Sequence, residues 1–137
     1  MNINKAIVEK TIDLAENFEK AYEDFNAKYY PYGIVDLFND KYENTIEHKN
    51  MEGLELQLDN YLNSLDYENI KNLKSLMYLG RDNHYSKSES YEERLHKARE
   101  SCDVLGWQKD KGIVVTQMRR KLPLGEYLSR GLKIIGM

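Results

Sequence analysis

The N-terminal segment carries the pattern that most limits what this chain can fold into. Its apolar positions are spaced 4, 3, 4, 3 and 4 residues apart, which places them on one face of an amphipathic helix. Asn4 is a suitable N-cap, and the helix is expected to run to about Ala27, before Pro31 and Gly33 interrupt it. The residues of this face are Ile7, Thr11, Leu14, Phe18, Ala21 and Phe25.

Two later stretches have features of both strand and helix. Leu54, Leu56 and Leu58 alternate as in a strand, but a longer helical pattern runs on to Leu65 through strong helix formers. Residues 113–116 are β-branched, yet no convincing partner strand exists for them. Helix is the favoured interpretation of both stretches.

Capping residues place further helices in the second half. Asp66 is expected to begin a helix that ends at Gly80, in the left-handed C′ position. Ser86 with Glu89, and Ser90 with Glu93, match the capping-box pattern ahead of another helix. The apolar stripe of that helix is expected at Tyr91, Leu95, Ala98, Cys102 and Leu105.

These patterns together predict an all-α fold, a compact single-domain bundle of five or six helices over residues 1–137. A last helix begins near Pro123, and residues 31–50 are expected to be irregular, with a short helix at "IVDLF", residues 34–38. The residues expected to be buried together are Leu14, Phe18, Leu73, Met77, Leu95, Ala98, Leu128 and Leu132.

Composition and motifs exclude several classes of protein. No apolar run approaches the roughly 20 residues of a membrane span, and the N-terminus lacks the apolar region of a signal peptide, so a cytoplasmic location is expected. The single cysteine, Cys102, excludes an internal disulfide. His48, His84 and His96 form no metal-binding pair, and no phosphate-binding, dinucleotide or hydrolase motif occurs. We expect no catalytic residues, no metal and no cofactor.

Charge is divided unevenly along the chain. Residues 1–70 contain fifteen acidic side chains and six lysines, a net charge of −9, whereas residues 71–137 contain fourteen basic and eight acidic side chains, a net charge of +6. Such halves can attract each other within the fold, or they can form a polarised surface that steers a charged partner.

Five of the eleven tyrosines lie around the break after the first helix, among them Tyr29, Tyr30 and Tyr32. Tyrosine combines a large apolar area with a polar tip, so this cluster can form a protein interface or cover one edge of the core. Tyr29, Tyr30 and Tyr32 are therefore candidate binding residues, and the cluster makes a homodimer a further expectation.

The stretch "GRDNHY" is either a well-made turn between helices or a site. As a turn, Asp82 would tolerate the local geometry and Arg81 would pair with it or with the end of the preceding helix. As a site, Arg81 would hold an anion and His84 would carry a proton, oriented by Asp82. Arg119 and Arg120 near the end of another helix are also candidates for holding a phosphate or carboxylate.

The stretches "NLKSLMYLGR" and "LPLGEYLSRGLKIIG" resemble a bacterial family of small proteins described only as a domain of unknown function. The resemblance covers residues 73–136 and implies a mostly helical fold without an established activity. The sequence departs from the family pattern after Arg81, where Asp82 and Asn83 stand in place of Gly and Asp. The residues that carry it are Leu76, Met77, Leu79, Gly80, Arg81, Pro123, Leu124, Tyr127, Leu128, Gly131 and Leu132.

The sequence favours a non-catalytic protein that binds another macromolecule, most simply another protein, through a tyrosine-rich and charge-polarised surface. Membrane association and direct binding of nucleic acid are not expected. A first alternative is a phage-type inhibitor of a nucleic-acid-handling enzyme, such as a CRISPR nuclease, whose basic groove the acidic first half would occupy. A second alternative is a small enzyme that uses Arg81, Asp82 and His84.

Overall fold

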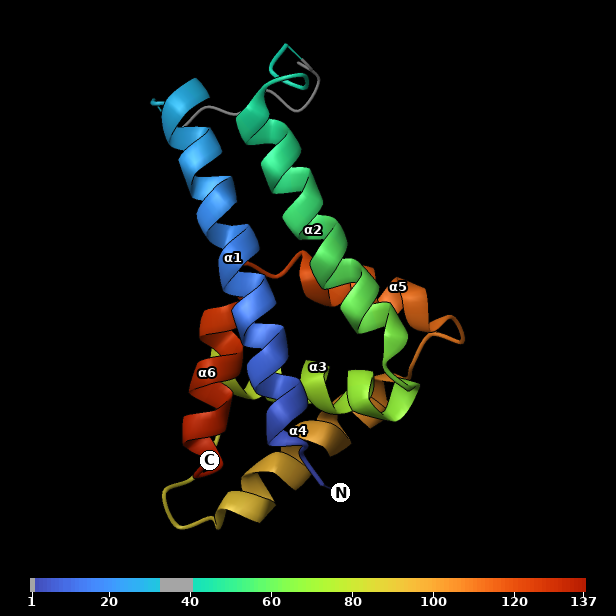
Figure 1. Cartoon of the computed structure of the whole chain (residues 1–137). Helices are drawn as coiled ribbons and strands as arrows, with labels where there is room; N and C mark the ends of the chain where they lie inside the picture. Colours follow the sequence, from blue (N-terminus) through green and yellow to red (C-terminus); the bar gives the residue numbers. More distant parts are fainter. Residues whose placement is uncertain (1, 33–40) are drawn as a thin grey trace.

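The computed structural model describes residues 2–32 and 41–137, and within them the chain forms six α-helices and no strand (Figure 1). This confirms the all-α, single-domain prediction. The helices are α1 (Lys5–Tyr29), α2 (Ile46–Ser64), α3 (Tyr67–Asp82), α4 (Tyr91–Leu105), α5 (Lys111–Arg119) and α6 (Leu124–Ile134).

Helices α1 and α2 run side by side in opposite directions, and their far ends project beyond the other helices as an arm (Figure 1). Helices α3 to α6 form the body of the molecule around the opposite half of this pair. Helix α3 packs against α4, α5 and α6, whereas α1 packs against α2 and α6. Every part of the body therefore contacts α3, which lies at its centre.

Side-chain caps define where most of the helices begin. Asn4 accepts a hydrogen bond from the amide of Ile7, and Asp66 accepts one from the amide of Asn69. Ser90 and Glu93 form the complete reciprocal capping box of α4. The predicted caps of these three helices are confirmed.

Both stretches with mixed patterns are helical, in α2 and α5, as favoured from the sequence. The prediction that residues 31–50 are irregular is wrong at its end, because Thr45 caps α2, which begins at Ile46. The expected short helix at residues 34–38 lies outside the described residues.

The prediction that Gly80 ends its helix in a left-handed conformation is also wrong. Helix α3 continues to Asp82, and the left-handed residue is Asn83, at φ 55°. Gly80 instead faces α6, where a Cβ atom would lie 1.8 Å from the carbonyl oxygen of Tyr127. A glycine is required here because two helix backbones approach each other closely.

The predicted core is largely confirmed. Five of its members lie in the main buried cluster, namely Leu73, Met77, Leu95, Leu128 and Leu132. Leu14 and Ala98 are only partly buried at the edge of that cluster, and Phe18 is buried outside it.

The expected stripes are wrong at a few positions. On α1, Val8 and Ala15 are buried in place of Ile7 and Leu14, which are half-buried. Helix α1 packs against two neighbours, α2 and α6, so its interior face is wider than a single stripe. On α4, the two ends of the stripe, Tyr91 and Leu105, are exposed.

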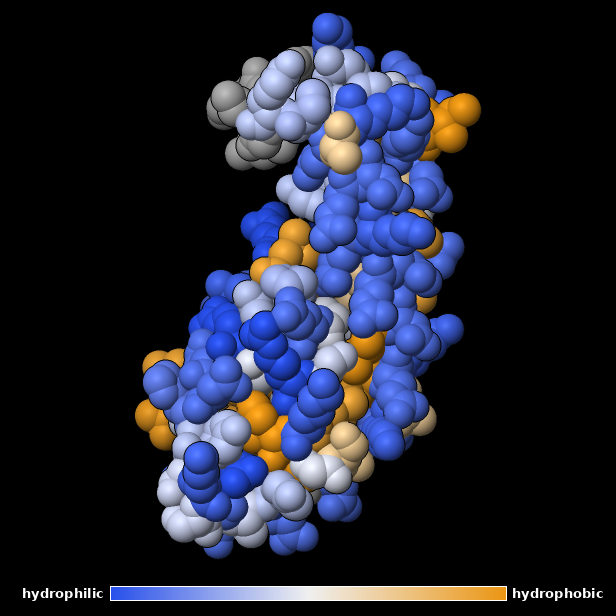
Figure 2. Space-filling view, turned by 90° about the vertical axis from the view of Figure 1, so that its left-hand side faces the viewer, coloured by the Kyte–Doolittle hydropathy of each residue, from blue (hydrophilic) through white to orange (hydrophobic). Residues whose placement is uncertain are grey.

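The face seen in Figure 2 is mostly hydrophilic along the arm, and its hydrophobic residues gather lower down, in the part that holds the body. No helix among the described residues has both the length and the apolar character that a membrane span requires.

Candidate binding cleft between helices α3 and α4

A cleft of about 440 Å³ lies between the C-terminal end of α3 and the outer side of α4. It brings together Arg81, Asp82 and His84, the three residues that the sequence had marked in the turn. The lining residues are Tyr78, Leu79, Arg81, Asp82, His84, Lys97, Ala98, Ser101, Cys102 and Leu105.

The cleft has an apolar floor and an apolar outer wall. Leu79 and Cys102, which are 4% and 9% exposed, form the floor together with the small side chain of Ala98. Leu105 stands at the wall with 88% of its surface exposed, and its neighbour Val104 is 80% exposed. The end of α4 thus carries apolar surface that the protein itself leaves uncovered.

Arg81 lies at the rim of the cleft and contacts two neighbouring side chains. Its Nε and Nη2 atoms donate hydrogen bonds to the two carboxylate oxygens of Asp82, at 2.7 and 3.3 Å. The guanidinium group also lies over the ring of Tyr78, 4.6 Å from its centroid. Asp82 therefore orients Arg81, and it accepts no hydrogen bond from His84 among the described contacts.

A second ion pair lies on the opposite side of the cleft. The ammonium group of Lys97 hydrogen-bonds to the Glu89 carboxylate, which follows the turn. This hydrogen bond lowers the pKa of Glu89 and raises the pKa of Lys97, so both groups stay charged over a wide pH range. The rim therefore carries two preformed ion pairs, Arg81 with Asp82 and Lys97 with Glu89.

The sulfur atom on the floor has the character of a core thiol. Burial raises the pKa of Cys102, and a hydrogen bond with the Ser75 side chain offsets only part of this effect. The neutral thiol is a weak nucleophile. Within residues 2–32 and 41–137, no cluster of His, Cys, Asp and Glu has an arrangement that could hold a metal ion.

The candidate tyrosines lie elsewhere, at the far end of the arm. Tyr29 and Tyr30 pack against Tyr42, with ring centroids 4.5 and 5.5 Å apart, and both also contact Phe25. The Tyr29 hydroxyl donates a hydrogen bond of 2.7 Å to Glu47. Tyr29 and Phe25 join α1 to α2 through Glu47 and His48. Tyr32 is 91% exposed and lines neither this cluster nor the cleft.

The candidate arginines lie at the end of α5. Arg119 is mostly buried and forms ion pairs with Asp59, at 2.5 Å, and with Glu55, at 3.5 Å, both on α2. Arg120 is exposed. Arg119 therefore joins α5 to α2, and its charge is already compensated within the chain.

A second arginine also links the two halves of opposite charge. Arg99 of α4 hydrogen-bonds to Glu68, at 2.7 Å, and to Asn72 and Asp103. Together with Arg119, it shows that part of the charge difference between the halves is used for attraction within the fold.

Several residues of the cleft were not singled out from the sequence. Tyr78 recurs with Lys71, Lys74 and Arg81 at spacings of 3, 4 and 3 residues, which place the four side chains along one face of α3. This spacing of polar and aromatic residues could have been recognised from the sequence. The exposure of Leu105 could not have been recognised in this way, because its spacing is that of a core residue.

Comparison with protein-family models, with curated proteins and with solved structures finds no match to this chain. The resemblance of residues 73–136 to a family of unknown function therefore stays a prediction.

Proposed function

We propose that this protein is a non-catalytic binding module that recognises another protein through the cleft between α3 and α4. The observation that carries the proposal is the combination of a buried apolar floor with the uncovered apolar end of α4. Covering exposed apolar side chains such as Leu105 and Val104 removes their surface from water, which favours association with another molecule. The apolar surface extends past the cleft, which suits a macromolecule better than a small ligand.

Two properties of the cleft support binding over catalysis. Asp82 is hydrogen-bonded to Arg81 and the thiol of Cys102 is buried and neutral, so the exposed His84 lacks the orienting contact with Asp82 that an enzyme would need. The charged rim consists of ion pairs around an apolar centre, which is the usual arrangement of a protein interface.

The test is a comparison of crosslinked partners in cells that express the protein. Leu105→Glu places a charge on the apolar wall at an exposed position, so the fold should persist while the partner is lost. The matched control is Leu56→Glu on α2, where the leucine is also exposed but lies far along the sequence from the cleft. A protein that is captured by the native chain and by Leu56→Glu, and is lost with Leu105→Glu, supports the proposal.

Capture that persists with Leu105→Glu contradicts it. If capture is instead lost when the acidic side chains of α1 are replaced by basic ones, the inhibitor with an acidic surface becomes the better explanation. Sedimentation of the purified protein tests the homodimer separately, because self-association would be lost with Tyr32→Ser if the exposed tyrosine contributes to it.

A further inference from the structure

A row of cations and aromatic rings continues from the cleft along the outer face of α3. We call it the cation–aromatic face and define it as Lys71, Lys74, Tyr78 and Arg81 of α3 with Trp107, which follows α4. The Lys71 ammonium group lies 5.5 Å from the centroid of the Trp107 ring, and the Lys74 ammonium group lies 5.4 Å from it. Lys74 also lies 5.7 Å from the ring centroid of Tyr78.

Lys74 differs from the other cations that are at least partly buried in this structure. Arg99 and Arg119 each bind two carboxylates, and Arg81 binds Asp82. Lys71 forms no ion pair in the described part of the chain, but its charge is attracted to Glu68 and Asp103 and lowers the pKa of both. Lys111 donates to two backbone carbonyl oxygens, and Arg94 donates to the carbonyl oxygen of Ile134.

Lys74 donates only to the amide oxygen of Gln117, at 3.4 Å, and no carboxylate lies within ion-pair distance of it in the described part of the chain. The aromatic rings compensate its charge weakly, because a cation–π contact is weaker than a desolvated ion pair.

A second cation adds to the weakly compensated positive charge at Lys74. Burial lowers the pKa of Lys74, and repulsion from the ammonium group of Lys121 lowers it further, although the Cys102 side chain acts in the opposite direction. Lys121 is exposed and follows α5, so this repulsion reaches Lys74 from an element other than its own helix, on the side where Lys74 contacts Gln117 of α5. A bound anion would offset the repulsion between Lys74 and Lys121, and it would also compensate the charge of Lys74 that burial has partly removed from water.

We propose that Lys74 and Lys121 form an anion subsite that binds a carboxylate from an acidic segment of the partner protein. This inference rests on the proposed function, because Tyr78 and Arg81 belong both to the cation–aromatic face and to the cleft. An apolar side chain of the segment would enter the cleft beside Leu105, while an acidic side chain nearby reaches the two amines.

An acidic protein segment fits this face better than single-stranded nucleic acid. Lysine and arginine cations already lie over the Trp107 and Tyr78 rings, so a base that stacks on either ring would compete with them. The chain also has a net charge of −3, which disfavours a long polyanion.

Trp107 is the only tryptophan in the chain, so all of the tryptophan fluorescence comes from a residue of this face. The probes are a short peptide of alternating glutamate and leucine, the same peptide with glutamine in place of glutamate, and a short single-stranded oligothymidylate. We expect the glutamate peptide to change the fluorescence saturably. Lys74→Gln and Lys121→Gln should each weaken its binding by about tenfold or more.

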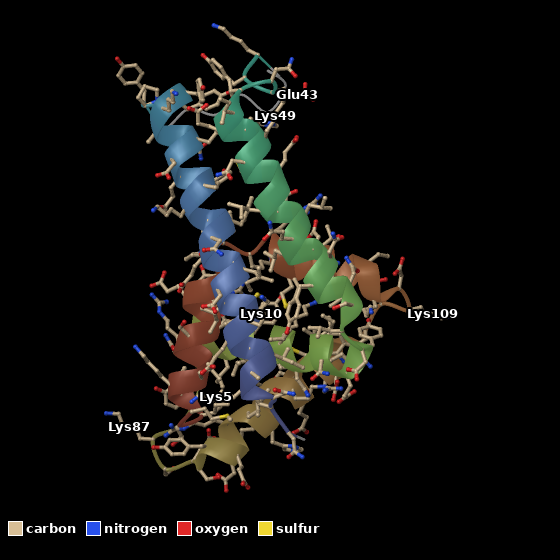
Figure 3. The ribbon with its side chains drawn as sticks, in the orientation of Figure 1. Lys5, Lys10, Glu43, Lys49, Lys87 and Lys109 are labelled. Atoms are coloured by element: carbon tan, nitrogen blue, oxygen red, sulfur yellow. The ribbon has the colours of Figure 1, made fainter. Side chains whose placement is uncertain are left out.

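The matched control is Lys10→Gln, which removes the same charge from an exposed position on α1 and should bind the peptide as the native chain does (Figure 3). Thermal melts of each variant show whether a loss of binding reflects a loss of folding, and Lys121→Gln at an exposed position keeps the test valid if Lys74→Gln unfolds. Equal binding of the glutamate and glutamine peptides overturns the subsite. Binding of oligothymidylate that depends on Lys74, without binding of the glutamate peptide, overturns the acidic protein segment.

The two proposals fail in different ways. Loss of partner crosslinking with Leu105→Glu but not with Lys74→Gln would leave the cleft in place and remove the subsite. If the glutamate peptide binds in a way that depends on Lys74, but Leu105→Glu does not change partner crosslinking, the subsite is supported and the cleft is not.

Discussion

Gly80 of α3 lies directly against the backbone of Gly131 of α6. A Cβ atom at Gly80 would lie 2.8 Å from the amide nitrogen of Gly131, and a Cβ atom at Gly131 would lie 2.5 Å from the carbonyl oxygen of Leu76. Because backbone atoms cannot rotate aside as a side chain can, the two helices can cross at this distance only with glycine on both sides. This crossing holds α6 against the same helix that carries the cleft.

We predict that Gly80→Ala destabilises the fold by about 3 kcal/mol, at the upper end of the usual cost of overpacking. The physical reason is the contact with the Tyr127 carbonyl oxygen, which only a separation of α3 from α6 could relieve. The control is Gly53→Ala on α2, where nothing lies within 4 Å of the added atom and helix propensity should add up to about 1 kcal/mol of stability. Urea unfolding of the two variants measures both effects, and equal midpoints would show that the helices do not touch here.

Leu95→Ala should destabilise the protein by about 2–5 kcal/mol, through lost burial and a cavity in the core. Leu95 is 7% exposed and belongs to the main buried cluster, whereas Leu105 on the same helix is exposed. Leu105→Ala should therefore change the free energy of unfolding by no more than about 0.5 kcal/mol. Chemical denaturation of both variants tests which face of α4 points inward. A larger loss of stability with Leu105→Ala than with Leu95→Ala would show that the face carrying Leu105 is the buried one.

Arg81→Ala and His84→Ala should each change stability by only about 0.5 kcal/mol, because both side chains reach solvent. If the cleft binds a partner, the same variants should weaken that binding while the melting temperature stays nearly constant. Paired melting and crosslinking measurements separate the two roles. A large loss of stability with unchanged partner capture would show that the residues serve only the turn.

The arm should lose a stabilising contact in acid. Hydrogen bonds from Lys28 and Tyr29 hold the pKa of Glu47 at about 2, below its ordinary value of 4.5. The stability that this carboxylate contributes is complete above its ordinary pKa and is lost as the pH falls from there toward the lowered value. We therefore expect the stability gap between the native chain and Glu47→Gln to narrow over that range.

Urea midpoints measured at a series of pH values follow this gap. The comparison variant is Glu43→Gln at the same end of the arm, which removes a carboxylate outside the contact between Lys28, Tyr29 and Glu47 (Figure 3). A gap that stays constant for Glu47→Gln would mean that the carboxylate is not bonded to Lys28 in solution.

The helices themselves could be predicted from local patterns. The spacing around Phe18 and the caps at Asn4, Asp66 and Ser90 act within one turn of helix, so neighbouring residues alone determine where those helices start. The end of α3 and the turn after it could likewise be singled out from their residue types, and Arg81 and Asp82 of the helix do share one cleft with His84 of the turn.

What the sequence could not decide depends on contacts between elements that are distant along the chain. Gly80 looked like a helix end because glycine serves left-handed ends and close crossings equally well, and only the packing of Gly131 against it distinguishes the two. Leu105 has the spacing of a core residue, yet it is 88% exposed because no other described element packs over the end of α4. The unpaired charge of Lys74 is likewise visible only once Trp107, Gln117 and Lys121 come together, because whether a cation has a partner is decided by tertiary structure and not by its neighbours in sequence.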